Sequence, residues 1–361
     1  MKIGTCQSKK GKIQSGFLNI SHQGKRMKIP IKILEGKKEG KTCFISAGMH
    51  GDELNGIYIV SKYIKSINPK KVNGTIIFIP VINRIGFHYG ERKIRYDDKD
   101  LNRCFNRKGN TFSHKVANTI FKKIVKKSDF GLDIHDSNKK NVLLPHARTF
   151  KKANKELDKI SQVFGTEIVM KREGSRGMLA KEALKKKVPV LTIETSGGMR
   201  LSPTFTAEAI RGINNVLAYY GMLEENINLP QKQFILDERI GYRSNMMGIL
   251  KLNKKLGDSV EKGEIIAEVF NPSHEKFKEL KSKNPGVLFS IKSNAHIKAN
   301  QRAFSILYFK KRGINIVPTQ GKMIENIESP IINIINSGIF NNSINAMTQH
   351  SKKFFYSLLN N

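Results

Sequence analysis

Hydrophobic runs alternate with segments of helical periodicity over the first two thirds of the chain. Runs such as GTIIFIPVI at 74–82 are almost continuously apolar, which is typical of strands covered on both faces. Strands that alternate with helices predict an α/β fold, with a mostly parallel mixed sheet and helices on both faces. The strands are expected at 41–47, 74–82, 129–134, 166–170 and 188–194, and the helices at 52–66, 114–127, 151–163, 177–187 and 206–221.

The pattern changes near Leu229-Pro230, where shorter, glycine-rich segments of alternating polarity begin. They continue to about Arg312 and predict a small all-β domain. Its turn residues Gly257-Asp258 and Val260–Gly263 resemble those of a barrel-sandwich domain of the biotinyl/lipoyl type, but the lysine context of a carrier domain is absent. We therefore expect a large α/β domain at 1–228, a small β barrel-sandwich domain at 229–313 and a C-terminal extension without an assigned role at 314–361.

The composition is that of a folded globular protein, with 39% hydrophobic and 26% charged residues. The chain has 64 Lys and Arg against 30 Asp and Glu, so its formal net charge is +34. The basic residues are scattered among Asn and Ile, without a dense basic arm, zinc-finger spacing or RNA-binding motif. This pattern favours a general compositional bias over nucleic-acid binding. Attraction of an anionic substrate or an acidic partner stays open as the alternative.

The cysteines and the N-terminus bear on the cellular compartment. Cys6, Cys43 and Cys104 form no CxxC pair, and their odd number argues against a disulfide framework. The N-terminal sequence lacks the apolar run of a signal peptide. No stretch approaches the roughly 18 apolar residues of a membrane span. We therefore expect a cytoplasmic protein that does not bind a membrane.

Two histidines and a glutamate stand close to the ends of expected strands. His50 and Glu53 are three residues apart at a helix start, so their side chains can point to the same side. His135 follows another buried strand, at the carboxyl edge where open α/β sheets place ligands. Imidazole and carboxylate groups suit Zn²⁺, and a catalytic site needs about three of them. The alternative is a satisfied histidine beside a solvated carboxylate, because H-x-x-E alone is common.

Further charged residues accompany these three. Asp133 is expected to orient a metal ligand, or alternatively to cap the end of its strand. Glu194 also ends a buried strand, where a carboxylate beside a metal makes a good general base. Its alternative is a structural ion pair. The charge-rich segment 95–103 carries guanidinium groups that can bind a carboxylate or an oxyanion, unless it is merely a solvated face.

The order of these motifs resembles that of the succinylglutamate desuccinylase/aspartoacylase family, a branch of the zinc carboxypeptidase-like hydrolases. The matching stretches are AGMHGDELNG at 47–56, RYDDKDLNR at 95–103, LDIHDS at 132–137 and PVLTIETSGG at 189–198. The resemblance implies a zinc carboxypeptidase-like fold. It also implies a zinc-dependent amidohydrolase that cleaves an N-acyl amino acid or a similar small carboxylate-bearing substrate.

The resemblance implies roles for individual residues. One zinc ion per chain is bound by His50, Glu53 and His135. Glu194 acts as the general base and later as the proton donor to the leaving amine, and Arg95 polarises the scissile carbonyl and holds the oxyanion. The implied substrate-binding residues are Asn102, Arg103 and, in the loop at 174–177, Arg176.

Two other functions stay open at this point. One is a metallocarboxypeptidase or deglutamylase that acts on a peptide terminus, and the other is a non-catalytic binding protein. Asp136 departs from many relatives, in which a small or hydroxylated residue follows the metal-site histidine, and its charge would alter the pocket or recruit a cationic substrate group. The small β domain is expected to cap the zinc site or to form a contact in a homo-oligomer, with a structural appendage as the alternative.

Overall fold

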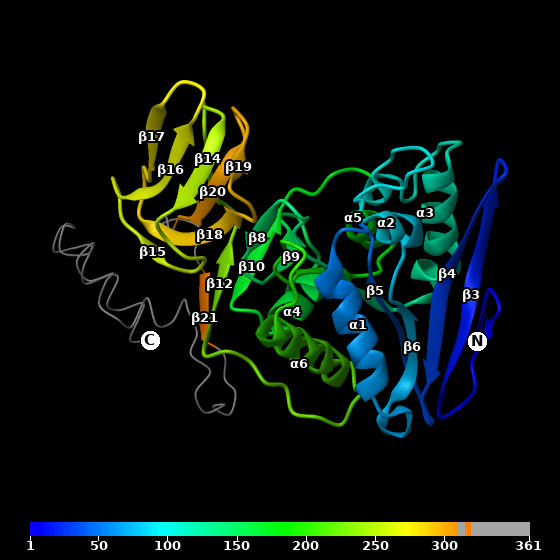
Figure 1. Cartoon of the computed structure of the whole chain (residues 1–361). Helices are drawn as coiled ribbons and strands as arrows, with labels where there is room; N and C mark the ends of the chain where they lie inside the picture. The colour runs from blue at the N-terminus through cyan, green and yellow to red at the C-terminus, as the bar shows by residue number, and fades with distance from the viewer. Residues whose placement is uncertain (309–314, 319–361) are drawn as a thin grey trace. The chain divides into compact units, whose positions relative to one another are not determined.

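The computed structural model describes residues 1–308 and 315–318, which belong to two compact units (Figure 1). The α/β unit comprises Met1–Lys139 and Pro145–Pro230. The β unit comprises Lys140–Leu144 and the chain from Gln231 onward. The structure thus divides after Pro230, and it also assigns a short segment within the expected large domain to the β unit. The expected extension at 314–361 lies outside the described residues, except for Asn315–Pro318.

The α/β unit is built on one mixed sheet with the strand order β10-β9-β11-β7-β5-β6-β4-β3. The central strands β11, β7, β5 and β6 are parallel, and β10 is parallel to β9. The pairs β11–β9, β6–β4 and β4–β3 are antiparallel. A mixed α/β sheet is confirmed, and its parallel part lies at the centre. The strands are β3 (Lys12–His22), β4 (Lys25–Glu35), β5 (Lys38–Ala47), β6 (Asn73–Ile79), β7 (Phe130–His135), β9 (His146–Phe150), β10 (Ile168–Arg172) and β11 (Val190–Glu194).

A long hairpin of β3 and β4 forms one edge of this sheet and has no counterpart among the expected strands (Figure 1). Its two turn residues, Gln23 and Gly24, both have positive φ angles, of 48° and 74°. Such a turn matches the twist of the two strands that it joins. Burial alternates along β3, where Leu18 and Ile20 are buried between exposed neighbours. A small pair, β1 (Lys2–Ile3) and β2 (Cys6–Gln7), precedes the hairpin.

Helix α6 (Pro203–Tyr219) contacts both α1 (Leu54–Ser66) and α4 (Lys155–Val163). Figure 1 shows α1 and α6 side by side in front of the sheet. Helix α1 packs closely on β7. A Cβ atom added to Gly56 of α1 would lie only 2.6 Å from the carbonyl oxygen of Ile134 in β7. The other helices are α2 (Arg84–Tyr89), α3 (Phe112–Lys123) and α5 (Leu179–Leu184), with short 3-10 turns at Pro69–Lys71, Leu101–Arg103 and Val125–Lys127.

The described part of the β unit consists of strands, as expected for an all-β domain. One sheet has the order β13-β20-β18-β15, with β8 paired to β18, and a second has the order β17-β16-β14-β19. Their core contains Tyr242 stacked on Phe304 with ring centroids 4.7 Å apart. The barrel-sandwich and zinc carboxypeptidase-like classifications stay predictions. The strands are β8 (Asn141–Leu143), β12 (Lys232–Leu236), β13 (Ile240–Arg243), β14 (Gly248–Leu252), β15 (Ser259–Val260), β16 (Ile265–Asn271), β17 (Lys276–Lys281), β18 (Gly286–Lys292), β19 (His296–Ile297), β20 (Arg302–Leu307) and β21 (Asn315–Pro318).

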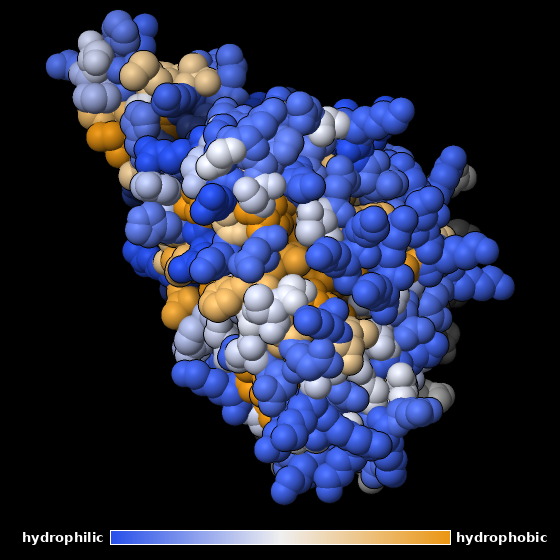
Figure 2. Space-filling view, turned by 90° about the vertical axis from the view of Figure 1, so that its right-hand side faces the viewer, coloured by the Kyte–Doolittle hydropathy of each residue, from blue (hydrophilic) through white to orange (hydrophobic). Residues whose placement is uncertain are grey.

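Charged and other polar residues cover most of the surface that Figure 2 shows. On the face drawn in Figure 2, hydrophilic residues surround a smaller group of hydrophobic ones. Within residues 1–308 and 315–318, no helix combines the length and the apolar character that a membrane crossing requires.

Candidate metal centre

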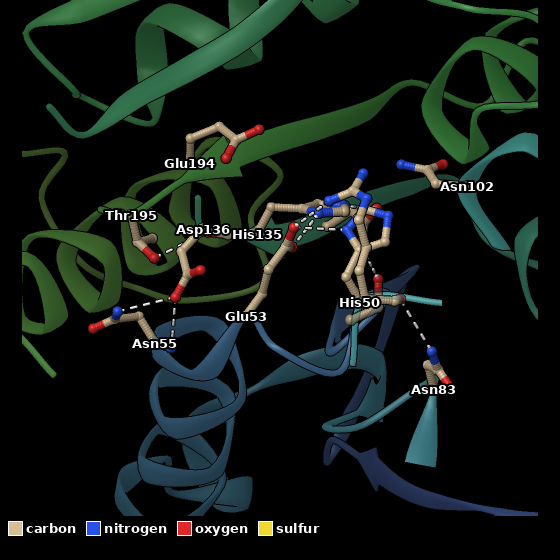
Figure 3. A network of polar contacts seen from close by, with 12 residues as sticks. His50, Glu53, Asn55, Asn83, Asn102, His135, Asp136, Glu194 and Thr195 are labelled. Carbon is tan, nitrogen blue, oxygen red and sulfur yellow. Dashed lines mark hydrogen bonds and ion pairs between the residues drawn. The ribbon is translucent and has the colours of Figure 1, made fainter. Parts of the chain in front are cut away.

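Two histidines and a glutamate from different segments meet at the carboxyl edge of the sheet. His50 and Glu53 lie between β5 and α1, and His135 is the last residue of β7. Their donor atoms all lie within 4.8 Å of one another, and all three side chains are buried. Figure 3 shows Glu53 between the two imidazoles, with its Oε1 2.7 Å from His50 Nδ1 and its Oε2 2.8 Å from His135 Nδ1. The structure therefore brings together the three residues expected to bind zinc.

The turn that carries His50 and Glu53 depends on a glycine. A Cβ atom on Gly51 would lie 1.9 Å from the carbonyl carbon of Gly86, so only glycine fits there. Glu53 is the N-cap residue of α1, yet its side chain makes no capping hydrogen bond. That side chain instead reaches the two histidines.

The outer nitrogen of each imidazole meets a second carboxylate. His50 Nε2 lies 3.0 Å from Asp100 Oδ1, and His135 Nε2 lies 2.9 Å from Asp133 Oδ2. A carboxylate only accepts hydrogen bonds, so each Nε2 carries the proton and donates it. In zinc sites this arrangement orients the ligating imidazole and raises its basicity. Asp133 lies where the sequence predicts an orienting group and accepts a further hydrogen bond from Ser46 Oγ at 2.7 Å, whereas the sequence did not single out Asp100.

The charges around the centre favour a bound cation. Burial alone lowers the pKa of His50 and of His135, but the carboxylates beside them outweigh burial and raise both values. Burial raises the pKa of Glu53, but the two histidines more than offset this and hold that pKa below its usual value. Two imidazole nitrogens and one carboxylate are also a donor set that suits zinc, so the residues fit this ion.

An arginine that the sequence interpretation missed contacts the centre. Arg92 donates from Nη1 to Glu53 Oε1 and from Nη2 to Asp100 Oδ2, both at 3.1 Å. Arg95, expected to hold the oxyanion, has a side chain that is 55% exposed. It lies 3.6 Å from Glu91 and over the ring of Tyr89. The structure thus places Arg92, and not Arg95, against a metal-ligand candidate.

Glu194 ends β11 and lies directly beside His135 in the parallel register of β11 and β7 (Figure 3). Its side chain is buried and forms an ion pair with Arg148 from β9. The next residue, Thr195, donates to the carbonyl oxygen of His135 from its backbone at 3.0 Å and from its hydroxyl at 2.9 Å. The strand end that carries Glu194 is therefore tied to the strand end that carries a ligand.

The expected substrate-binding residues lie in a turn and a nearby loop. Asn102 is buried, and its Oδ1 accepts a hydrogen bond from the backbone of Leu179 at 2.8 Å. Arg103 donates to the carbonyl oxygen of Asn102 at 2.7 Å, and Arg176 is exposed. The described hydrogen bonds of Asn102 and Arg103 hold the loop together, and their roles toward a substrate stay predictions.

Gly177 holds this loop in place, and its replacement by alanine should destabilise the fold. Its φ angle is +80°, and a Cβ atom would lie 2.1 Å from the carbonyl oxygen of Arg103. We expect Gly177→Ala to lower the free energy of unfolding by about 1–3 kcal/mol, measured by urea denaturation. Gly221 is the control because its φ angle is +69° but nothing lies within 4 Å of its added Cβ. An equal loss in Gly221→Ala would show that the close approach to Arg103 contributes nothing.

Comparisons with known proteins place the chain in a family. Residues 39–220 match the profile of the succinylglutamate desuccinylase/aspartoacylase catalytic domain. The N-alpha-acetyl-L-2,4-diaminobutyric acid deacetylase of Halomonas elongata is 28% identical over 276 residues, which cover 72% of this chain and 80% of that protein.

Solved structures share the fold. A succinylglutamate desuccinylase from Silicibacter sp. TM1040 has a TM-score of 0.75 at 24% identity, over 85% of this chain and 99% of that one. The product-bound ectoine utilization protein EutE (DoeB) from Ruegeria pomeroyi has a TM-score of 0.76 at 21% identity, over 84% and 99% of the two chains. The family match spans more than half of this chain, so the chain belongs to the succinylglutamate desuccinylase/aspartoacylase family.

Proposed function

We propose that the protein is a zinc-dependent hydrolase that cleaves the amide bond of an N-acyl amino acid or a similar small, carboxylate-bearing molecule. One observation carries this proposal: His50, Glu53 and His135 converge at a strand end beside Glu194. The deacetylase of Halomonas elongata supports the reaction class, since its name specifies removal of an acetyl group from an amino acid. A single zinc ion per chain and a cytoplasmic location are part of the proposal.

The proposed mechanism assigns a task to each group of the centre. Zinc bound by the three ligands would lower the pKa of a water molecule towards neutrality. Glu194, on the strand next to His135, takes a proton from the attacking water and later delivers it to the leaving nitrogen. Asp100 and Asp133 hold the two imidazoles with Nδ1 turned inward. Asn102 and Arg103 are the proposed partners of the substrate carboxylate.

Arg92 is the stronger candidate for stabilising the oxyanion, because it lies at Glu53 while Arg95 is largely exposed. We expect Arg92→Ala to lower kcat about 100-fold, the effect of losing one oxyanion donor. Arg95→Ala is the matched control and should lower kcat by less than about tenfold, since surface ion pairs contribute little. The measurement is steady-state hydrolysis by both zinc-loaded variants. A larger loss of kcat in Arg95→Ala than in Arg92→Ala would indicate that Arg95 stabilises the oxyanion.

The proposal is tested by stripping the protein of metal, adding zinc back and screening a substrate panel. The panel contains N-acyl amino acids that differ in acyl group and side chain, together with short peptides. Zinc-dependent release of a free amine from an N-acyl amino acid is the expected result. Turnover of peptides alone would favour a carboxypeptidase, and no turnover at all after zinc is restored would contradict a hydrolase.

A further inference from the structure

Asn55 and Asp136 lie beside the metal centre and have no part in the proposed chemistry. Their relative exposures are 1% and 2%. Asp136 Oδ2 accepts two hydrogen bonds from Asn55, one from its backbone nitrogen at 2.9 Å and one from its Nδ2 at 3.0 Å (Figure 3). We propose that this pair positions the metal ligands by fastening the start of α1 to the end of β7. The inference rests on the proposed function, since it assumes a zinc site.

The start of α1 lacks its ordinary cap. The first backbone N–H groups of a helix have no partner within the helix, and the side chain of the N-cap residue commonly accepts one of them. Here the N-cap residue is Glu53, whose carboxylate faces His50 and His135 and caps nothing. Asp136 takes over this task from a distant part of the sequence by accepting the hydrogen bond of Asn55 N–H. Glu53 is thereby left available as a ligand while the N–H group of Asn55 still has a partner.

The two residues also sit next to the ligands along the chain. Asp136 directly follows His135, and Asn55 lies two residues after Glu53. The close approach of Gly56 to the carbonyl of Ile134 shows that α1 and β7 are in direct contact at this point. A hydrogen-bonded link between Asn55 and Asp136 therefore sets how far apart Glu53 and His135 can lie.

Asn55 extends the link to a third segment. Its Nδ2 also donates to the carbonyl oxygen of Arg200 at 2.9 Å, and its Oδ1 accepts from the backbone of Ser202 at 3.2 Å. Arg200 and Ser202 belong to the connection between β11, which ends at Glu194, and α6. The backbone and side chain of Asn55 thus join the segments that carry Glu53, His135 and Glu194.

The test measures the affinity of the purified full chain for zinc by competition with a chelator. We expect Asp136→Ala to weaken zinc binding about tenfold, the lower end of the usual effect of losing a group outside the ligand shell. Asp136→Asn should bind zinc nearly as well as the wild type, because its side-chain oxygen can still accept from Asn55. Asn154→Ala is the matched control: Asn154 caps α4, which carries no ligand, by accepting from Leu157 N–H at 2.8 Å. That variant should lose stability and keep its zinc affinity.

The outcomes separate this inference from the proposed function. Wild-type protein that binds zinc tightly, with unchanged affinity in Asp136→Ala, would overturn the positioning role and leave the zinc site standing. Equal weakening in Asn154→Ala would also overturn it, since general destabilisation would then explain the effect. If Asp136→Ala does not fold, Asn55→Ala decides, because it removes only the side-chain links and should also weaken zinc binding. Wild-type protein that binds no zinc would overturn both the inference and the proposed function.

Discussion

Replacing Glu194 by glutamine is expected to lower kcat by roughly 10²–10⁴-fold, the usual contribution of a general base. Glutamine has nearly the same shape, but it cannot take a proton from the attacking water. Glutamine loses the charge that pairs with Arg148 but fills the same space, and Glu194 is not one of the three proposed ligands, so the variant should fold and keep its zinc. The measurement is steady-state hydrolysis of the best substrate from the panel, with zinc content determined on the same sample.

Glu182→Gln provides a matched control for this substitution. Glu182 is also a buried glutamate of the α/β unit, but it accepts hydrogen bonds from Gly177 N–H and Lys185 and serves the structure. We expect its variant to lose stability. Its kcat should stay within a few-fold of the wild type, which corresponds to a change of about 1 kcal/mol or less in the activation free energy. If Glu194→Gln retains wild-type kcat, Glu194 is not the base.

Replacing Glu53 by alanine is expected to lower both zinc binding and kcat/KM. Glu53 contacts both histidines, so Glu53→Ala removes the only carboxylate among the three candidate ligands. Loss of the metal would forfeit several kcal/mol of transition-state stabilisation, and about 4 kcal/mol corresponds to a roughly 10³-fold lower kcat/KM. The measurement compares hydrolysis by wild type and variant across a range of added zinc.

The control for this experiment is His274→Ala, which removes an exposed histidine of the β unit. Its activity and zinc dependence should match those of the wild type. Full activity of Glu53→Ala at low zinc would exclude Glu53 as a ligand, whatever the behaviour of the control.

The candidate metal centre could be anticipated because its residues stand at the ends of expected strands and their order resembles that of a known family. Buried apolar runs mark the strands that end near His50, His135 and Glu194. The parallel central strands then bring these ends to one edge of the sheet. Residue types that suit zinc stand at those ends, so the pattern indicates the place, while the resemblance to the family implies the ligand set and the roles.

The contact of Arg92 with the centre could not be predicted from the sequence, where the resemblance pointed only to Arg95. Both lie in one short, charged segment, and either one can match an expected anion contact. In the fold, Ile94 between them is buried and its backbone pairs with Lys99, so the two arginine side chains have different surroundings. Arg92 then reaches Glu53, while Arg95 packs on Tyr89 at the surface. Asp100 was missed for a related reason, since its contact with His50 spans fifty residues of the chain.

The first hairpin was missed although its sequence carries a signal. Its strands alternate hydrophobic residues with lysine and other polar residues, as strands with one exposed face do. Neither strand contains the long, continuous apolar run that marks a strand covered on both faces. The turn at Gln23-Gly24, which needs two positive φ angles, is the feature that indicates the hairpin. The Asn55–Asp136 link has no such local signal, because it depends on how α1 meets β7.

The most direct test of the metal centre is a crystal structure of the zinc-loaded protein, with diffraction data collected on both sides of the zinc absorption edge. We predict one anomalous peak in the α/β unit, at roughly 2.0–2.2 Å from His50 Nδ1, His135 Nδ1 and a carboxylate oxygen of Glu53. A zinc-saturated crystal with no peak between these three side chains would contradict the account.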